Sequence, residues 1–121
     1  MNKINLREKF EKFDGYWRPR IIGELNGQFV KLAKLKGDIV WHTHEHEDEF
    51  FQVIKGRLSI QMRDGTVELS EGECFIVPRG VEHKPVAQEE AHVLLFEPTS
   101  TAHTGKVKDK MTVEIEDQAW I

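Results

Sequence analysis

The most chemically specific stretch of this 121-residue chain reads His42-Thr43-His44-Glu45-His46-Glu47-Asp48-Glu49. A second segment, Pro78-Arg79-Gly80-Val81-Glu82-His83, adds one more histidine. Four of the chain's six histidines lie in these two short segments. Imidazole nitrogens together with a carboxylate oxygen suit Zn²⁺, Mn²⁺, Fe²⁺, Ni²⁺ or Cu²⁺, whereas Ca²⁺ prefers sites made of oxygen alone. The two segments therefore indicate a candidate metal site.

Strand geometry explains how these residues could meet. Side chains alternate across a β-strand, so His42 and His44 would share one face. The next strand is expected to begin near Glu49, which has the parity of the apolar residues two and four positions further on. If those apolar residues face the interior, Glu49 faces it too. His83 follows a Pro-x-Gly turn that would start another strand and bring it to the same place.

The other polar residues of the first stretch are alternatives. His46 has the parity of His42 and His44, but it falls where the chain must turn, so we expect it to be solvated or to lie behind the ligands. Three further acids could in principle replace Glu49 as a ligand: Glu45, Glu47 and Asp48. The apolar pattern after Glu49 favours Glu49, and we expect the other acids to form a solvated rim.

From about residue 27 onward the pattern is that of short β-strands separated by turns, several of which contain glycine. The pair Asp64-Gly65 between two alternating apolar runs predicts a hairpin. No helical crossover intervenes, which predicts an antiparallel sandwich or small barrel. The expected strands are Gln28–Lys36, Asp38–His42, Phe50–Lys55, Arg57–Arg63, Thr66–Leu69, Glu73–Val77, His83–Ala87 and His92–Glu97.

We expect a single domain over residues 1–121, with a barrel core at about 27–97. Apolar residues at helical spacing predict a short N-terminal helix at about 5–13, capped by Asn5. Residues 98–121 form a C-terminal extension, in which Met111–Ile115 could be a last strand and His103 is expected to be exposed.

The amino-acid composition limits the classes of partner that the chain is expected to have. The chain is 39% hydrophobic and 31% charged, with a net charge of −4, and its apolar stretches are short. These values predict no nucleic-acid partner and no membrane partner. The N-terminus lacks the apolar segment of a signal peptide, and the single cysteine, Cys74, cannot form an internal disulfide. We therefore expect a cytoplasmic protein in which Cys74 is buried and inert.

The two segments resemble the motifs of small single-domain cupins. The first reads Gly37-x4-His42-x-His44-x4-Glu49-x6-Gly56, and the second reads Gly72-x5-Pro78-x-Gly80-x2-His83. The resemblance covers residues 37 to about 87 and is greatest to bacterial phosphomannose-isomerase-like cupins, a label that usually reflects the barrel. The sequence departs from the pattern in two places: Gly37 lies one residue closer to the histidines, and Ala87 replaces a common asparagine.

The resemblance implies an all-β, antiparallel double-stranded β-helix (a cupin or jelly-roll barrel) that follows the short N-terminal helix. It also implies one divalent transition metal (Zn, Mn, Fe, Ni or Cu), held by His42, His44, Glu49 and His83. Cupins often pair through sheet surfaces, so a homodimer is expected, with Trp41, Phe50 and Ile54 facing away from the metal.

Four protein ligands leave open positions on such a metal, and the expected pocket suits a small molecule. Its expected apolar walls are Val40, Phe51, Val53, Leu58, Ile60, Met62 and, with less support from the pattern, Phe75 and Phe96. The hypotheses are an isomerase, lyase or dioxygenase, a non-catalytic metal-dependent binding or sensing module, and a structural cupin with an adventitious metal. No catalytic residue can be assigned, because no second inward acid is identifiable.

Overall fold

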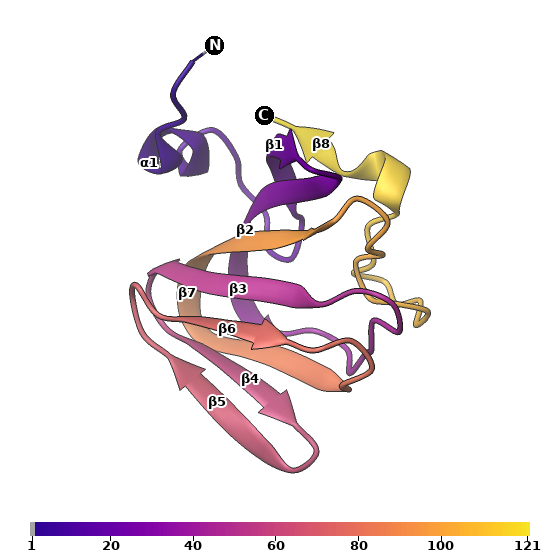
Figure 1. Cartoon of the computed structure of the whole chain (residues 1–121). Helices are drawn as coiled ribbons and strands as arrows, with labels where there is room; N and C mark the ends of the chain where they lie inside the picture. Colours follow the sequence, from indigo (N-terminus) through magenta and orange to yellow (C-terminus); the bar gives the residue numbers. More distant parts are fainter. Residues whose placement is uncertain (1) are drawn as a thin grey trace.

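The structure is a computed structural model and describes residues 2–121 (Figure 1). One short helix precedes a set of strands, and a 3₁₀ turn lies near the C-terminus. The elements are α1 (Leu6–Phe10), β1 (Arg20–Leu25), β2 (Gln28–Asp38), β3 (Glu49–Lys55), β4 (Leu58–Met62), β5 (Gly65–Leu69), β6 (Cys74–Val77), β7 (His83–Pro98), η1 (Ile115–Asp117) and β8 (Ala119–Trp120). This confirms the predicted all-β class with a short N-terminal helix.

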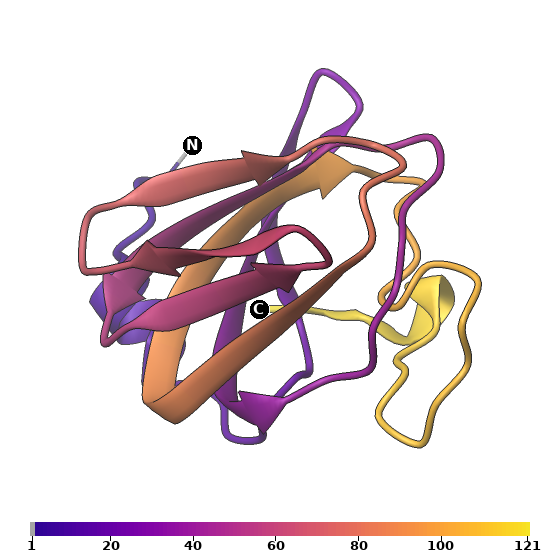
Figure 2. The same cartoon turned by 90° about the horizontal axis from the view of Figure 1, so that it is seen from below.

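The strands form two sheet layers that share β2 and β7. Hydrogen bonding runs β5-β4-β7-β2-β1-β8, while β3 pairs with both β6 and β7. Figure 2 shows the two layers folded over each other around a common interior. The main core lies between them and consists of side chains such as Ala33, Val53, Ile60 and Val93, each at most 1% exposed. Nearly all pairings are antiparallel, and β8 adds one short parallel pairing to β1.

Strand β7 connects the two layers because its two halves have different partners. Its first half pairs with β4, from Met62↔His83 to Ser59↔Val86, and its second half pairs with β3, from Lys55↔His92 to Phe50↔Phe96. Residues 88–90 are exposed and bulge out between the halves. Ala87 and Ala91 are four positions apart and both are buried, so the inward parity continues across the bulge. Both His83 and Glu97, near opposite ends of the strand, therefore face the interior.

Some boundaries differ from those predicted. Strand β1 was not predicted, although it forms a hairpin with β2 through Asn26-Gly27, where both residues have positive φ. The predicted strands 83–87 and 92–97 are one continuous strand. The predicted strand Met111–Ile115 is wrong: Ile115 begins η1, and the last strand is β8. Cys74 was expected to be buried but is exposed, because β6 turns Val77 rather than Cys74 inward.

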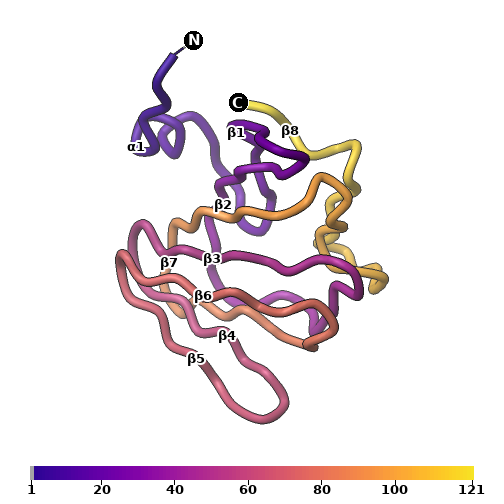
Figure 3. Tube along the Cα trace, in the orientation of Figure 1, coloured from indigo at the N-terminus to yellow at the C-terminus, as the bar shows by residue number. Residues whose placement is uncertain are grey.

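The C-terminus lies beside β1, as the tube in Figure 3 shows, and it contacts helix α1. The Ile121 backbone N–H donates to Ile21 O at 3.0 Å, and Lys9 Nζ donates to Ile121 O at 2.6 Å. Helix α1 ends at Phe10, earlier than predicted, and the Asn5 side chain caps it by accepting from Glu8 N. Neither described helix has the length and apolar character needed to cross a membrane.

The bend in β7 leaves no room for a side chain at Gly56, the last residue of the first sequence motif. Gly56 has φ +89°, and a Cβ there would lie 2.9 Å from Glu90 O and 3.2 Å from Ala91 Cα. Gly72 has a similar φ of +86° but open space around it. Replacing Gly72 by alanine should cost about 1–2 kcal/mol of backbone strain. Gly56→Ala should cost about 1–3 kcal/mol more, because it also clashes with the β7 backbone.

The free energies of unfolding of the two variants, measured by chemical denaturation, check this expectation. Equal losses in the two variants would show that the contact between Gly56 and the β7 bend does not constrain the fold.

Candidate metal centre

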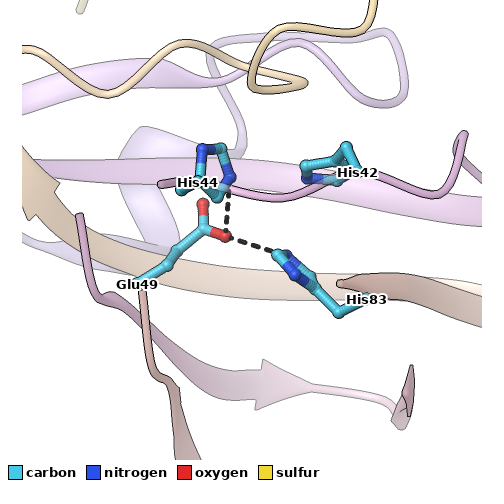
Figure 4. A group of neighbouring side chains, drawn as sticks. All are labelled: His42, His44, Glu49 and His83. Carbon is cyan, nitrogen blue, oxygen red and sulfur yellow. Dashed lines mark ion pairs between the residues drawn. The ribbon is translucent and has the colours of Figure 1, made fainter. Parts of the chain in front are cut away.

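Four side chains converge between the two layers: His42, His44, Glu49 and His83. Each offers one ligand atom, and these atoms all lie within 4.8 Å of one another. All four residues are buried, with exposed fractions between 0% for His83 and 6% for Glu49. Figure 4 shows His42 and His44 on one stretch of chain, with Glu49 and His83 reaching towards them. The structure therefore brings together the four residues that the sequence indicated.

Backbone hydrogen bonds fix where these side chains start. His42 and His83 form an isolated antiparallel bridge, with His42 N donating to His83 O at 3.1 Å and His83 N donating to His42 O at 2.9 Å. The carbonyl of His44 accepts from Gly80 N at 2.8 Å, which ties the first motif to the Pro-x-Gly turn of the second. Glu49 is the first residue of β3, and it points inward together with Phe51 and Val53, as predicted from parity.

Two of the imidazole rings are oriented by carbonyl groups two residues earlier. His42 Nδ1 lies 2.8 Å from Val40 O, and His83 Nδ1 lies 2.9 Å from Val81 O. A carbonyl oxygen only accepts, so each Nδ1 carries the proton and each neutral ring presents the lone pair of Nε2. Such outer partners commonly set the tautomer of histidines that bind metals.

The centre contains electron-rich atoms that no protein group satisfies. Glu49 Oε1 lies 3.4 Å from both His44 Nε2 and His83 Nε2 (Figure 4). All three atoms are buried and lack a hydrogen-bond partner among the described residues. Leaving such polar atoms unpaired is costly, and a cation placed among them would remove the cost. The donor set thus fits a divalent transition metal.

Burial and close charges set the pKa values of these groups. Burial and, to a smaller extent, the neighbouring His83 lower the pKa of His42 to about 4. Burial alone would raise the pKa of Glu49, but its contacts with His44 and His83 outweigh burial and hold that pKa well below its usual value. A neutral imidazole and an ionised carboxylate are the forms that bind a metal.

Sequence reasoning missed a second inward acid, Glu97, behind Glu49. Glu97 Oε1 lies 2.7 Å from Lys31 Nζ, with side-chain exposures of 4% and 2%. Glu97 Oε2 is buried and has no hydrogen-bond partner among the described residues. Burial and the Glu49 charge raise the pKa of Glu97 well above its usual value, which favours the protonated form of Glu97. The alternating parity of β7 could have revealed this residue.

The rest of the acidic stretch points away from the centre. The His46 side chain is 84% exposed and pairs only weakly with Glu45. Asp48 accepts from the Arg79 backbone N–H at 2.8 Å and from its guanidinium at 3.2 Å. These residues form the solvated rim that the sequence predicted.

A cavity of about 40 Å³ opens beside the centre. Of the predicted apolar walls, only Phe51 lines it, because the cavity lies towards β1 and β2 rather than towards the Leu58–Ile60 side of the core. His103 also lines it and is partly buried, so the expectation that this histidine is exposed was wrong. The lining residues are Trp17, Pro19, Ala33, Leu35, Ile39, His42, Glu49, Phe51, Pro85, Leu95 and His103.

Comparisons with known proteins agree with this geometry. The family model for the cupin domain (Cupin_2) matches residues 28–104. A crystal structure of a cupin-2 domain containing protein from Shewanella frigidimarina superposes with a TM-score of 0.77 at 45% identity, covering 78% of this chain and 93% of that one. The protein NMB1881 from Neisseria meningitidis gives a TM-score of 0.74 at 33% identity, with coverages of 80% and 99%.

Among curated proteins, the uncharacterized protein YdbB of Bacillus subtilis (strain 168) is 36% identical over 64 residues. That match covers 52% of this chain and 57% of YdbB, so the chain spans little more than half the length of this relative.

The ligand set predicts how metal content responds to mutation. Protein purified without chelator should contain about one divalent metal per chain. His83→Ala should weaken binding by more than the roughly 10- to 100-fold typical of losing an outer partner, because it removes a direct ligand. His46→Ala, which changes an exposed histidine of the same stretch, should leave the content unchanged. Elemental analysis and competition with a chelator measure both. Full metal content in His83→Ala would contradict the assignment.

The raised pKa of Glu97 leads to a separate prediction about how stability depends on pH. A carboxyl whose pKa is raised by folding stabilises the folded protein below its unfolded pKa and loses this contribution as the pH rises. Glu97→Gln is neutral at every pH, so its unfolding free energy relative to wild type should improve between about pH 4.5 and pH 7. Lys31→Met should cost about 1–3 kcal/mol, because it leaves the buried Glu97 Oε1 without its hydrogen-bond partner. Denaturation across this pH range tests both, and a large constant loss in Glu97→Gln would show that Glu97 is ionised.

Proposed function

The chain belongs to the cupin domain family, and on this premise we propose that it holds one divalent transition metal and binds a small oxygen-bearing molecule beside that metal. The proposed ligands are His42, His44, Glu49 and His83. The observation that carries the proposal is the set of buried polar atoms Glu49 Oε1, His44 Nε2 and His83 Nε2, which lie close together and lack a hydrogen-bond partner among the described residues.

The donor set restricts the metal to the borderline-soft and harder transition ions. Three imidazoles with one carboxylate suit Zn²⁺, Mn²⁺, Fe²⁺, Ni²⁺ or Cu²⁺, and metal availability decides between ions of similar affinity. When bound, such an ion would supply Lewis-acid polarisation of an oxygen atom that coordinates it.

The cavity limits the size of the molecule. His42 and Glu49 line it, so a molecule inside it would lie directly against the metal centre. Its volume of about 40 Å³ is far below the roughly 300–1,000 Å³ of drug-sized pockets. Apolar side chains such as Leu35 and Phe51 form most of the remaining wall and exclude water. We therefore propose a ligand, or a reacting end of a ligand, of only a few heavy atoms.

A metal-dependent enzyme is the second candidate, and the position of His42 at the cavity wall favours it, because a bound molecule would be exposed to the polarising metal. Isomerase, lyase and dioxygenase reactions on a small oxygenated substrate all fit this arrangement. Each of these reactions requires at least that the small molecule binds beside the metal. Homodimerisation and a cytoplasmic location stay predictions.

Acetate binding to the cobalt-loaded protein tests the proposal. Co²⁺ should occupy the four-ligand site and give a visible absorption spectrum, which acetate should perturb in a saturable manner. Metal-free protein and His83→Ala should bind no acetate by calorimetry. Equal acetate binding with and without metal would contradict the proposal. Oxygen uptake by the Fe²⁺-loaded protein in the presence of small oxygenated compounds would identify the dioxygenase form of the second candidate.

A further inference from the structure

The segment that follows β7 is docked on the outer side of the metal-motif stretch. We call residues 99–114 the C-terminal segment; Figures 1 and 2 both show it beside the connection between β2 and β3. Ser100 Oγ donates to Glu47 at 3.0 Å, and Lys106 Nζ pairs with Glu45 at 3.0 Å. Gly105, at φ +58°, packs so closely on the Thr43 backbone that a Cβ there would overlap the Thr43 carbonyl. The C-terminal segment therefore packs at a defined position next to His42 and His44.

Internal hydrogen bonds hold the shape of the C-terminal segment. Thr101 and Thr104 are 1% and 0% exposed. The hydroxyl groups of Thr104 and Thr112 lie 2.7 Å apart, and Thr112 Oγ1 also accepts from Asp109 N at 2.9 Å. A segment fixed in this way can hold a side chain at a set position against the cavity.

His103 is the side chain that the segment places at the cavity wall. Its Nδ1 accepts a hydrogen bond from Val113 N at 2.9 Å. A backbone N–H only donates, so Nδ1 carries no proton and the proton of the ring resides on Nε2. Burial also lowers the pKa of His103 to about 4, which keeps the ring neutral. Within residues 2–121 the bond from Val113 is the only one that His103 makes, so its Nε2–H remains available.

The Nε2–H of His103 and the metal centre can contact the same bound molecule, because both border one cavity. His42, Glu49 and His103 line the same space of about 40 Å³, and the other lining residues are apolar except for the indole N–H of Trp17. That N–H already donates to Lys36 O at 2.9 Å. In a space this small, a molecule in contact with the metal also lies close to His103.

We propose that His103 is a ligand-positioning residue, whose Nε2–H donates a hydrogen bond to a second oxygen of the molecule bound at the metal. The inference rests on the proposed function and names its ligand class: small carboxylates and related compounds with two neighbouring oxygen acceptors. One oxygen meets the metal, and the other meets His103. His103 is not a fifth metal ligand, because one ring nitrogen is occupied by Val113 and the other carries the proton.

Variants of His103 separate this role from a structural one. In His103→Asn the amide oxygen can still accept from Val113 N, but the side chain is too short to reach the ligand as Nε2 does. His103→Phe removes both contacts. His46→Asn is the matched control at an exposed histidine. For each Co²⁺-loaded protein we would measure the acetate dissociation constant from the cobalt spectrum, the affinity for Co²⁺ by chelator competition, and the protease resistance of the C-terminal segment.

The expected result is that His103→Asn weakens acetate binding about five- to tenfold, the size of one lost hydrogen bond, with Co²⁺ affinity and protease resistance unchanged. His46→Asn should match wild type in all three measurements. Wild-type acetate affinity in both His103 variants would overturn the inference while leaving the proposed function intact. A loss of Co²⁺ affinity in His103→Asn would overturn it in favour of a fifth ligand. Failure of wild type to bind Co²⁺ would refute the proposed function itself, and the inference with it.

Discussion

The architecture depends on the inward register of β7. This strand hydrogen-bonds to β2 along one edge and to β4 and β3 in turn along the other, so it fixes the relative position of both layers. Because the bulge at 88–90 preserves parity, one register sets the inward direction of both His83 and Glu97. A shift by one residue would turn every inward side chain outward. The metal centre is therefore specified by the same pairing that holds the barrel together.

The charge of the centre follows from the chemistry of its neighbours. Despite burial, contacts with His44 and His83 lower the pKa of Glu49, and burial together with the Glu49 charge raises the pKa of Glu97, so Glu49 is the anionic carboxylate and Glu97 the neutral one. Three histidines that are neutral when they bind metal add no charge. Although burial lowers the pKa of His44, Glu49 raises it overall, so a proton held on His44 has to leave before a divalent ion enters. A metal would be held by directional lone pairs rather than by bulk attraction, which suits a transition ion more than Ca²⁺.

The candidate centre was predictable from sequence because its determinants are local. The alternation of side chains placed His42, His44 and Glu49 on inward faces, and the Pro-x-Gly turn placed His83. The residues that were missed depend on long-range packing. Lys31 and Glu97 meet across 66 positions of sequence, and His103 lies in a segment without any periodic pattern. Strand β1 was missed although Asn26-Gly27 is a strong local signal for the hairpin that β1 forms with β2.

Apart from the exposed His46, each residue of the stretch 42–49 has a structural partner. His42, His44 and Glu49 face the centre, while Thr43, Glu45 and Glu47 contact the C-terminal segment, and Asp48 holds Arg79. Alternation accounts for His42, Thr43 and His44, and the turn at 45–48 then resets the parity so that Glu49 also faces the centre. Glu45 and Glu47 of the rim therefore have a structural role besides any effect on the metal. They hold in place the C-terminal segment, which carries His103. The metal ligands and the segment that places His103 at the cavity are therefore positioned by the same stretch of chain.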